Sequence, residues 1–252
     1  MAQGQPTLKT RREIDIMREA GRIVAETLAL VSKEVRPGLT TADLDKIGHD
    51  YIRSRGAVPS FKGYNGFPAS LCTSVNEEIV HGIPGPRVLQ EGDLLSIDCG
   101  AFYRGYHGDA ATTVGVGRID LTAQKMIDVG WESLWAGIKL ARAGNRLEDI
   151  SATIQEVLER NGYGVVRDLV GHGIGRRLHE PPNVPNFGRR GQGLRLVPGM
   201  VLAIEPMLTQ GSYEGRTLED EWTIVTVDKG LAVHVEHTVA ITDGDPEILT
   251  LP

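Results

Sequence analysis

The sequence predicts an α+β fold built from two similar halves around a central antiparallel sheet. The order of elements repeats, since two helical patterns precede β-type runs and two further helical patterns precede strands. Two stretches also recur: Arg36-Pro-Gly returns as Arg142-Ala-Gly, and an apolar run ending in Asp98 returns as one ending in Glu205, at offsets of 106 and 107 residues. We therefore expect a single domain, residues 1–252, duplicated internally over about 10–118 and 119–250.

The composition is that of an ordinary globular protein. The chain has 252 residues, of which 40% are hydrophobic and 24% are charged, so it can bury a large core without disulfides or structural metals. The formal charge of −6 disfavours broad nucleic-acid binding, which needs a basic face. We therefore expect no direct nucleic-acid specificity.

The N-terminal segment and the cysteines bear on location. Cys72 and Cys99 form no CxxC pair, which excludes a disulfide framework and favours a reducing compartment. The N-terminal residues contain no apolar targeting segment, and no apolar run approaches the roughly 20 residues of a membrane span. We expect a soluble cytoplasmic protein without membrane contact.

The first half begins with two helices. Apolar residues at helical spacing predict a helix from Thr10 to Lys33, with Thr10 as N-cap and Glu13 completing a capping box. A second helix is expected from Thr41 to near Gly56. Two β-type runs between residues 79 and 117, LLSIDCGAF and HGDAATTVGVG, flank a glycine-containing turn and predict a hairpin.

The second half repeats this pattern. Helical spacing returns from about Thr122 to Arg142 and from about Leu147 to Asn161. The rest of the chain is expected to form strands and glycine-rich loops.

Two aspartates of the predicted hairpin indicate a cation site. With the turn at Tyr103-Arg104, Asp98 and Asp109 would lie directly opposite each other, with Cβ atoms about 4.5–5.5 Å apart. Two ionised carboxylates at that spacing repel each other. A cation between them would remove the repulsion.

Three further residues strengthen this interpretation. Glu205 lies in the apolar run VLAIEP, Glu236 lies in HVEHTVAI, and His172 stands between glycines in GHGIG. Buried acids need partners, so five such residues are best explained by one shared site. Four carboxylates exceed the charge of one divalent ion, and oxygen ligands with one imidazole suit cobalt, manganese, iron or zinc. We expect two divalent ions, an arrangement common in hydrolases.

Five segments carry a resemblance to a known family: TSVNEEIVHGIP, SIDCGAFYRGYHGDAATT, GHGIGRRLHEPP, AIEPM and HVEHTVAIT. In order and spacing they resemble the signature blocks of the type I methionine aminopeptidases, in their short bacterial-type form, from about residue 8 to 250. The resemblance implies the pita-bread fold, which is itself made of two related halves. It further implies that the initiator methionine is removed from deformylated nascent proteins and peptides when the second residue is small.

The resemblance also implies residue roles. Asp98, Asp109, His172, Glu205 and Glu236 match the family's metal ligands, with Asp109 and Glu236 as the bridging pair and Glu205 also as a proton shuttle. His179 matches the histidine that hydrogen-bonds the scissile carbonyl, and His81 the one that positions the substrate and the leaving nitrogen. The methionine pocket falls on Phe61, Tyr64, Phe67, Cys72, Leu178 and Trp222.

The expected partners are the N-termini of nascent polypeptides, and the resemblance favours a monomer. Weak association with ribosomes is a further hypothesis, which rests on five arginines near the expected mouth of the site: Arg176, Arg177, Arg189, Arg190 and Arg195.

Three alternatives remain open at this point. A proline-directed peptidase of the same fold would lack the deep apolar slot that methionine needs. A binding protein of this fold without metal would have no reason to retain all five ligands. A metal-dependent phosphoesterase would also use two ions, but the chain contains no P-loop motif.

Overall fold

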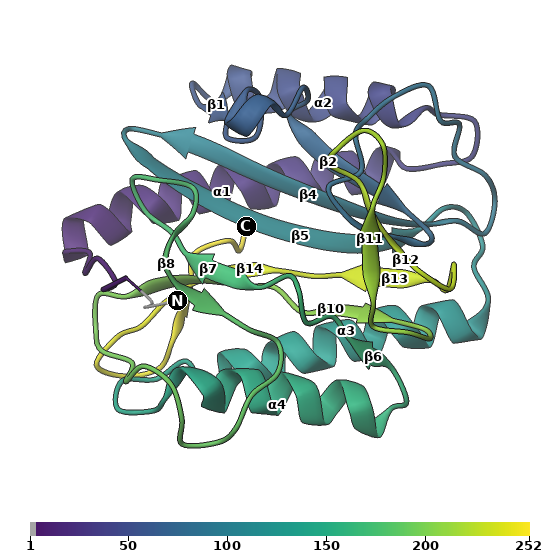
Figure 1. The fold of residues 1–252 in the computed structure, drawn as a ribbon. Coiled ribbons are helices and arrows are strands. Elements are labelled where there is room, and N and C mark those ends of the chain that lie inside the picture. Colours follow the sequence, from purple (N-terminus) through teal and green to yellow (C-terminus); the bar gives the residue numbers. More distant parts are fainter. Residues whose placement is uncertain (1–3) are drawn as a thin grey trace.

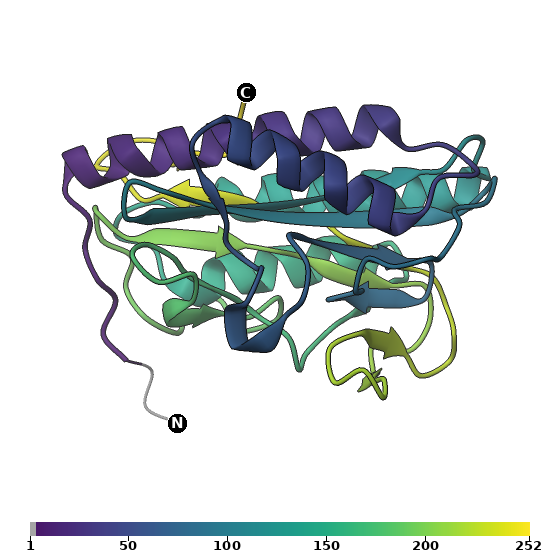
Figure 2. The same ribbon diagram turned by 90° about the horizontal axis from the view of Figure 1, so that it is seen from above.

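Two pairs of helices flank the strands in the computed structural model, which describes residues 4–252 (Figure 1). Helices α1 (Arg11–Glu34) and α2 (Thr41–Ser54) lie at the top of Figure 1, and α3 (Leu121–Ile138) and α4 (Leu147–Arg160) lie at the bottom. Figure 2 shows α1 and α2 side by side, and α1 packs on β4 and β5 while α2 packs on β1 and β2. This arrangement confirms the predicted α+β fold.

The helix ends follow their capping residues. The Thr10 side chain accepts from the Glu13 backbone N–H while the Glu13 carboxylate accepts from the Thr10 N–H, so the predicted capping box is confirmed. The predicted end of α3 at Arg142 is wrong, because the helix ends at Ile138. The side chain of Asn145 donates to the Leu140 carbonyl and turns the chain there.

The strands of residues 4–252 form four antiparallel sheets. The first contains β1 (Val58–Pro59), β4 (Leu94–Tyr103), β2 (Leu71–Val75) and β5 (Tyr106–Gly115), which pairs with β4. The second has the order β15 (Glu247–Ile248), β14 (His237–Ala240), β9 (Val201–Ile204), β7 (Gly171–Gly173) and β8 (Glu180–Val184).

Two small sheets complete the fold. One contains β13 (Ala232–His234), β10 (Met207–Thr209) and β6 (Gly164–Val165). The other contains β11 (Gly215–Thr217), β12 (Ile224–Thr226) and β3 (Glu78–Val80). A 3-10 turn, η1 (Tyr64–Gly66), precedes β2.

The predicted hairpin is present, but its predicted turn is wrong by one residue. Tyr103 pairs with Tyr106, so the two turn residues are Arg104 and Gly105, with φ of 48° and 92°. A two-residue hairpin turn with positive φ at both positions matches the twist of the strands, and Gly105 adopts this conformation without steric cost.

This register changes the relation between the two aspartates. Asp98 pairs with Ala111, and Asp109 pairs with Gly100, so the aspartates are not directly opposite each other. They are diagonal neighbours on one face of the sheet, where Cβ atoms lie within roughly 7–8 Å. The prediction of directly opposed side chains is therefore wrong, while their common face is retained.

The two large sheets meet where β5 runs beside β14. The Glu236 N–H donates to the Ala111 carbonyl at 2.9 Å. The Thr238 hydroxyl donates to the Asp109 carbonyl at 2.7 Å and accepts from the Asp109 N–H at 3.1 Å. This seam joins residues from the two halves of the chain and places Asp109 beside Glu236.

Two apolar clusters back the seam. The first lies between α1, α2 and the β2–β4–β5 strands and includes Val24, Val31, Leu44 and Ile97. The second lies between α3, α4 and the β9–β14 strands and includes Leu134, Ile154, Leu202 and Val239. No helix within residues 4–252 is both long and apolar enough to cross a membrane.

Helix α1 lies very close to Leu249 and to Gly108 of β5 at the position of Gly21. A Cβ atom on Gly21 would lie 2.1 Å from the Leu249 carbonyl oxygen, and one on Gly108 would lie 2.7 Å from the Gly21 nitrogen. Both contacts involve backbone, which cannot move aside as the end of a side chain can. The glycine pair therefore sets the distance between α1 and β5.

We expect Gly21→Ala to lower the free energy of unfolding by about 1–3 kcal/mol through overpacking. In an exposed helix the same change would stabilise by about 0.5–1 kcal/mol, so the sign itself reports the close approach. Urea denaturation measures the effect, with Arg12→Ala at an exposed position of α1 as the control. A more stable Gly21→Ala protein would contradict this packing.

Candidate metal centre

A cavity of about 300 Å³ opens at the seam between the two large sheets. Its lining combines carboxylates and histidines with apolar and aromatic side chains. Its lining includes Asp98, Asp109, Glu205, Glu236, His81, His179, Phe61, Tyr64, Phe67, Cys72, Leu178 and Trp222, and also Asn65. His172 lies beside it, with Nε2 3.7 Å from Glu205 Oε1. The structure thus brings all thirteen predicted site residues to one place.

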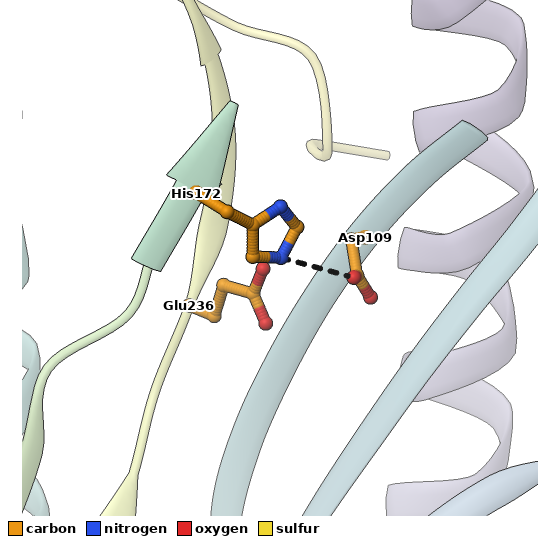
Figure 3. Close-up of side chains that lie close together, drawn as sticks. All are labelled: Asp109, His172 and Glu236. Carbon is orange, nitrogen blue, oxygen red and sulfur yellow. Dashed lines mark ion pairs between the residues drawn. The ribbon is translucent and has the colours of Figure 1, made fainter. Parts of the chain in front are cut away.

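Different strands supply the acidic side chains and His172. Asp98 lies on β4, Asp109 on β5 and His172 on β7, while Glu205 follows β9 and Glu236 precedes β14. His172 Nε2 lies 3.8 Å from Asp109 Oδ2, and ligand atoms of Asp109, His172 and Glu236 all lie within 4.8 Å of one another. Figure 3 shows these three side chains pointing toward a common point.

The polar atoms of this cluster lack partners within the described protein. Asp98 Oδ1, Asp109 Oδ1 and Glu236 Oε1 are buried without a hydrogen bond. Unpaired buried carboxylate oxygens are costly, and a bound cation is one of the few groups that can satisfy several at once. The donor set of carboxylates with one imidazole therefore fits divalent metal ions.

The ionisation of the acids points the same way. Burial raises the pKa of Asp98 to about 7. Burial, together with repulsion from the neighbouring carboxylates, raises the pKa values of Asp109 and Glu236. The protein alone therefore disfavours full ionisation of this cluster, and positive charge within it would favour the carboxylate forms.

Glu205 behaves differently because histidines surround it. Burial alone would raise its pKa, but His234 and His172 outweigh burial and lower it. His234 Nε2 lies 3.4 Å from Glu205 Oε2 and 4.0 Å from Glu236 Oε2, and His234 is buried. The sequence reasoning did not place His234 in the site, although its alternation with Glu236 put both on one face.

His179 stands at the rim of the cavity. Its Nδ1 lies 2.7 Å from the Tyr64 hydroxyl, and its ring centroid is 4.2 Å from that of His172. Desolvation of its packed side and the nearby His172 lower the pKa of His179, so the imidazole is neutral at pH 7. With the Tyr64 hydroxyl donating to Nδ1, Nε2–H is free to donate into the cavity.

His81 adopts a left-handed backbone conformation, with φ of 60°. Such a conformation in a histidine is uncommon and stores strain that the surrounding structure must hold. Burial lowers its pKa, so it too is neutral at pH 7. Its ring meets Trp222 edge to face, with centroids 6.2 Å apart.

The apolar wall is compact. Phe61, Phe67, Cys72 and Leu178 are all buried, and the Phe67 and Trp222 rings meet edge to face with centroids 5.1 Å apart. Asn65 also lines the cavity. It lies next to the predicted Tyr64 but has no apolar signal of its own, so the pattern of apolar residues missed it.

Two of the five arginines in the ribosome hypothesis have acidic partners. Arg190 pairs with Glu156 at 2.5 Å, and Arg176 pairs with Glu13 at 3.4 Å. Arg177, Arg189 and Arg195 are exposed. The hypothesis of a basic docking patch stays a prediction.

The comparisons with known proteins agree with one another. Residues 15–243 match the profile of Metallopeptidase family M24. A methionine aminopeptidase of Clostridium acetobutylicum is 58% identical, over 97% of this chain and 98% of its own length. Methionine aminopeptidase 1 of Bacillus subtilis is 54% identical, over 96% of this chain and 98% of its own length.

Solved structures extend this result to the fold. The methionine aminopeptidase of Thermotoga maritima superposes with a TM-score of 0.97 at 44% identity, over 98% of this chain and 100% of that one. Prolidase from Pyrococcus furiosus has a TM-score of 0.79 at 23% identity, over 97% of this chain and 65% of that one. These likenesses confirm the predicted pita-bread fold.

Substitutions of His172 and His179 should have different effects on metal binding. We expect Asp109→Ala and His172→Ala to lower metal affinity, because each removes a proposed ligand. His179→Ala should keep the metal and lose kcat by roughly 10²–10³, as expected for a transition-state donor. Isothermal titration of apoprotein with Mn²⁺ and peptide hydrolysis provide the two measurements. Loss of metal from His179→Ala would require a different ligand assignment.

Proposed function

The chain belongs to metallopeptidase family M24, and on that basis we propose that it acts as an aminopeptidase on polypeptides that begin with methionine. Its relatives at 54–58% identity over nearly the whole chain are methionine aminopeptidases, and the chain is a metal-dependent hydrolase that removes N-terminal methionine. The observation that supports the proposal most strongly is this sequence identity over nearly the whole chain. The proline-directed alternative is not supported, since the prolidase likeness is one of fold at 23% identity.

The proposed ligands are the five predicted ones, Asp98, Asp109, His172, Glu205 and Glu236. These four carboxylates and one imidazole would hold two divalent ions. The unpaired buried oxygens of Asp98, Asp109 and Glu236 support this assignment. When bound, such ions supply the Lewis acidity that lowers the pKa of a water molecule and polarises the scissile carbonyl.

The protein's own residues move the proton. The lowered pKa keeps Glu205 ionised, so its carboxylate can take the proton of the attacking water and give it to the leaving amine nitrogen. His234 Nε2, 3.4 Å from Glu205 Oε2, contributes to this lowered pKa. We assign the proton shuttle to Glu205 on this arrangement.

Two neutral histidines handle the substrate. His179 would donate from Nε2 to the scissile carbonyl oxygen as negative charge develops on it, while Tyr64 fixes the ring through Nδ1. His81 stands beside Trp222 and would orient the leaving nitrogen. Both are neutral at pH 7, so each can donate a hydrogen bond without bringing a positive charge into the site.

The methionine side chain would occupy the apolar wall. A thioether is soft and weakly polar, so rings and aliphatic groups suit it. Phe61, Phe67, Cys72 and Leu178 are buried there, with Tyr64 and Trp222 packed against the same cluster. We assign these six residues to the methionine pocket.

The setting of the reaction extends the proposal. The substrates would be deformylated N-termini of nascent chains, because a formyl group blocks the free α-amine. We propose that the protein acts as a cytoplasmic monomer, in keeping with its two free buried cysteines. Weak ribosome association through the five arginines, and descent of the two halves from a duplication, remain parts of this proposal.

Removal of metal should abolish activity. We expect chelator-treated protein to be inactive and Mn²⁺ or Co²⁺ to restore turnover, because the metal ions would supply the Lewis acidity that activates water and polarises the carbonyl. Titrating each metal against activity gives the stoichiometry, with elemental analysis as the control. Full turnover by protein shown to be free of metal would contradict the metal requirement.

Substrate choice should depend on the first two residues of the peptide. Met-Ala-Ser should be cleaved, whereas Met-Lys-Ser should be slow, because a long second side chain displaces the carbonyl and a shift of ~1 Å costs about 10²-fold in rate. Leu-Ala-Ser should be about 10–200-fold slower, since a branched chain fits the thioether slot poorly.

Release of the free N-terminal amino acid measures all three rates. Formyl-Met-Ala-Ser serves as the blocked control and should not be cleaved. Equal rates on Met-Lys-Ser and Met-Ala-Ser would disprove the small-residue rule. Preference for an Xaa-Pro peptide without methionine would instead favour the proline-directed class.

A further inference from the structure

A short loop between β7 and β8, residues 174–179, presents two site residues. Leu178 forms part of the apolar wall, and His179 points to the metal centre. Gly173 pairs with Glu180 across the base of the loop. The loop is therefore only six residues long, and its position decides where the His179 imidazole lies.

The carboxylate of Glu180 links the loop to the N-terminal segment through hydrogen bonds. Its Oε1 accepts from the Arg177 backbone N–H at 3.1 Å. Its Oε2 accepts from Lys9 Nζ at 2.8 Å and from the Thr7 hydroxyl. Burial disfavours the charged form, but the bonds from Lys9 and Thr7 outweigh burial and lower the pKa of Glu180 to about 2. The group is thus an ionised carboxylate at neutral pH.

Lys9 reaches the loop from the other end of the chain. The N-terminal segment, residues 4–10, runs beside β7 and β8 before α1 begins (Figure 1). The Lys9 and Glu180 side chains are only 5% and 4% exposed. Lys9 Nζ also donates to the Thr7 hydroxyl at 2.5 Å and to the Thr7 carbonyl at 3.1 Å, so all three of its protons have partners.

Gly175 makes room for this ion pair. A Cβ atom on Gly175 would lie 2.5 Å from Lys9 Cε, 2.9 Å from Lys9 Nζ and 2.9 Å from Glu180 Oε1. The Gly175 carbonyl accepts from the His107 backbone N–H at 2.8 Å, which holds the loop against β5 on its other side. The ion pair and the loop backbone are therefore in direct contact.

The Lys9–Glu180 ion pair takes no part in the proposed chemical steps. It touches no proposed metal ligand and lies outside the lining of the cavity. A buried ion pair is weak support for stability, because desolvation offsets most of the attraction. Loss of one partner is a different matter, since it leaves an unpaired charge that only solvent entry or movement of the loop can relieve.

We propose that Lys9 and Glu180 are positioning residues for His179, which fasten the 174–179 loop to the N-terminal segment so that the imidazole faces the scissile carbonyl. The inference rests on the proposed function, because it takes the role of His179 from there. Tyr64 fixes the rotation of the ring, whereas the ion pair fixes the backbone that carries it.

The test compares Lys9→Met, Glu180→Gln and the double variant. Each single variant should lower kcat on Met-Ala-Ser by about 10- to 100-fold, as expected for a displacement of up to ~1 Å, while KM and Mn²⁺ stoichiometry stay near wild type. The double variant lacks the same fastening and should be about as slow as either single variant, because the two substitutions remove one shared contact. Thr7→Val, which removes one hydroxyl contact, should give a smaller loss and serves where Lys9→Met does not fold.

Val31→Ala is the matched control, because it creates a buried cavity in α1 far from the loop. It should lower the melting temperature and leave kcat unchanged well below that temperature. In ¹³C-histidine-labelled apoprotein, the His179 NMR signal, assigned by its loss in His179→Ala, should shift in Lys9→Met and stay shifted in the double variant.

Two outcomes would overturn the proposal. Single variants with lowered melting temperature but wild-type kcat and an unmoved His179 signal would make the pair merely structural. A double variant that regains wild-type kcat would show that an unpaired charge in the single variants, and not loss of the fastening, displaces the loop. Failure of the proposed function is distinguishable, because wild-type protein would then not release methionine at all.

Discussion

Repulsion among buried carboxylates is the constraint on which the rest of the site depends. Asp98, Asp109, Glu205 and Glu236 converge beside one cavity, and several of their oxygens have no partner within the described protein. Burial raises the pKa values of Asp98, Asp109 and Glu236, so the protein alone does not stabilise their charges. Two rigid sheets nevertheless hold the acids together. Such an arrangement is stable as a set of carboxylates only with positive charge between them.

The seam between the sheets is how the fold imposes that convergence. The hydrogen bonds of Thr238 and Glu236 to β5 tie one half of the chain to the other. Each sheet is backed by its own helix pair and apolar cluster, so neither can move away to relieve the repulsion. The absence of side chains at Gly21 and Gly108 lets α1 pack closely against β5. The fold therefore keeps the four carboxylates close together despite their mutual repulsion.

Different features of the structure position the two neutral histidines, His179 and His81. Tyr64 fixes the ring of His179, and strained backbone at positive φ presents His81. The buried Lys9–Glu180 pair holds the loop that carries His179. The apolar residues Phe61, Phe67, Cys72 and Leu178 line the same cavity, and in the proposed function they receive the methionine side chain.

The sequence by itself determined much of this protein. Helical spacing and the Thr10–Glu13 capping box predicted the first helix. Acids within apolar runs marked Glu205 and Glu236, because such residues are costly to bury without a partner. Tertiary structure decided what depends on exact register and on distant segments. The hairpin turns at Arg104-Gly105, so the aspartates are diagonal, and His234 and Asn65 join the site. Lys9 meets Glu180 across 171 positions of chain, a contact that no local pattern encodes, because only the packed fold brings the two charges together.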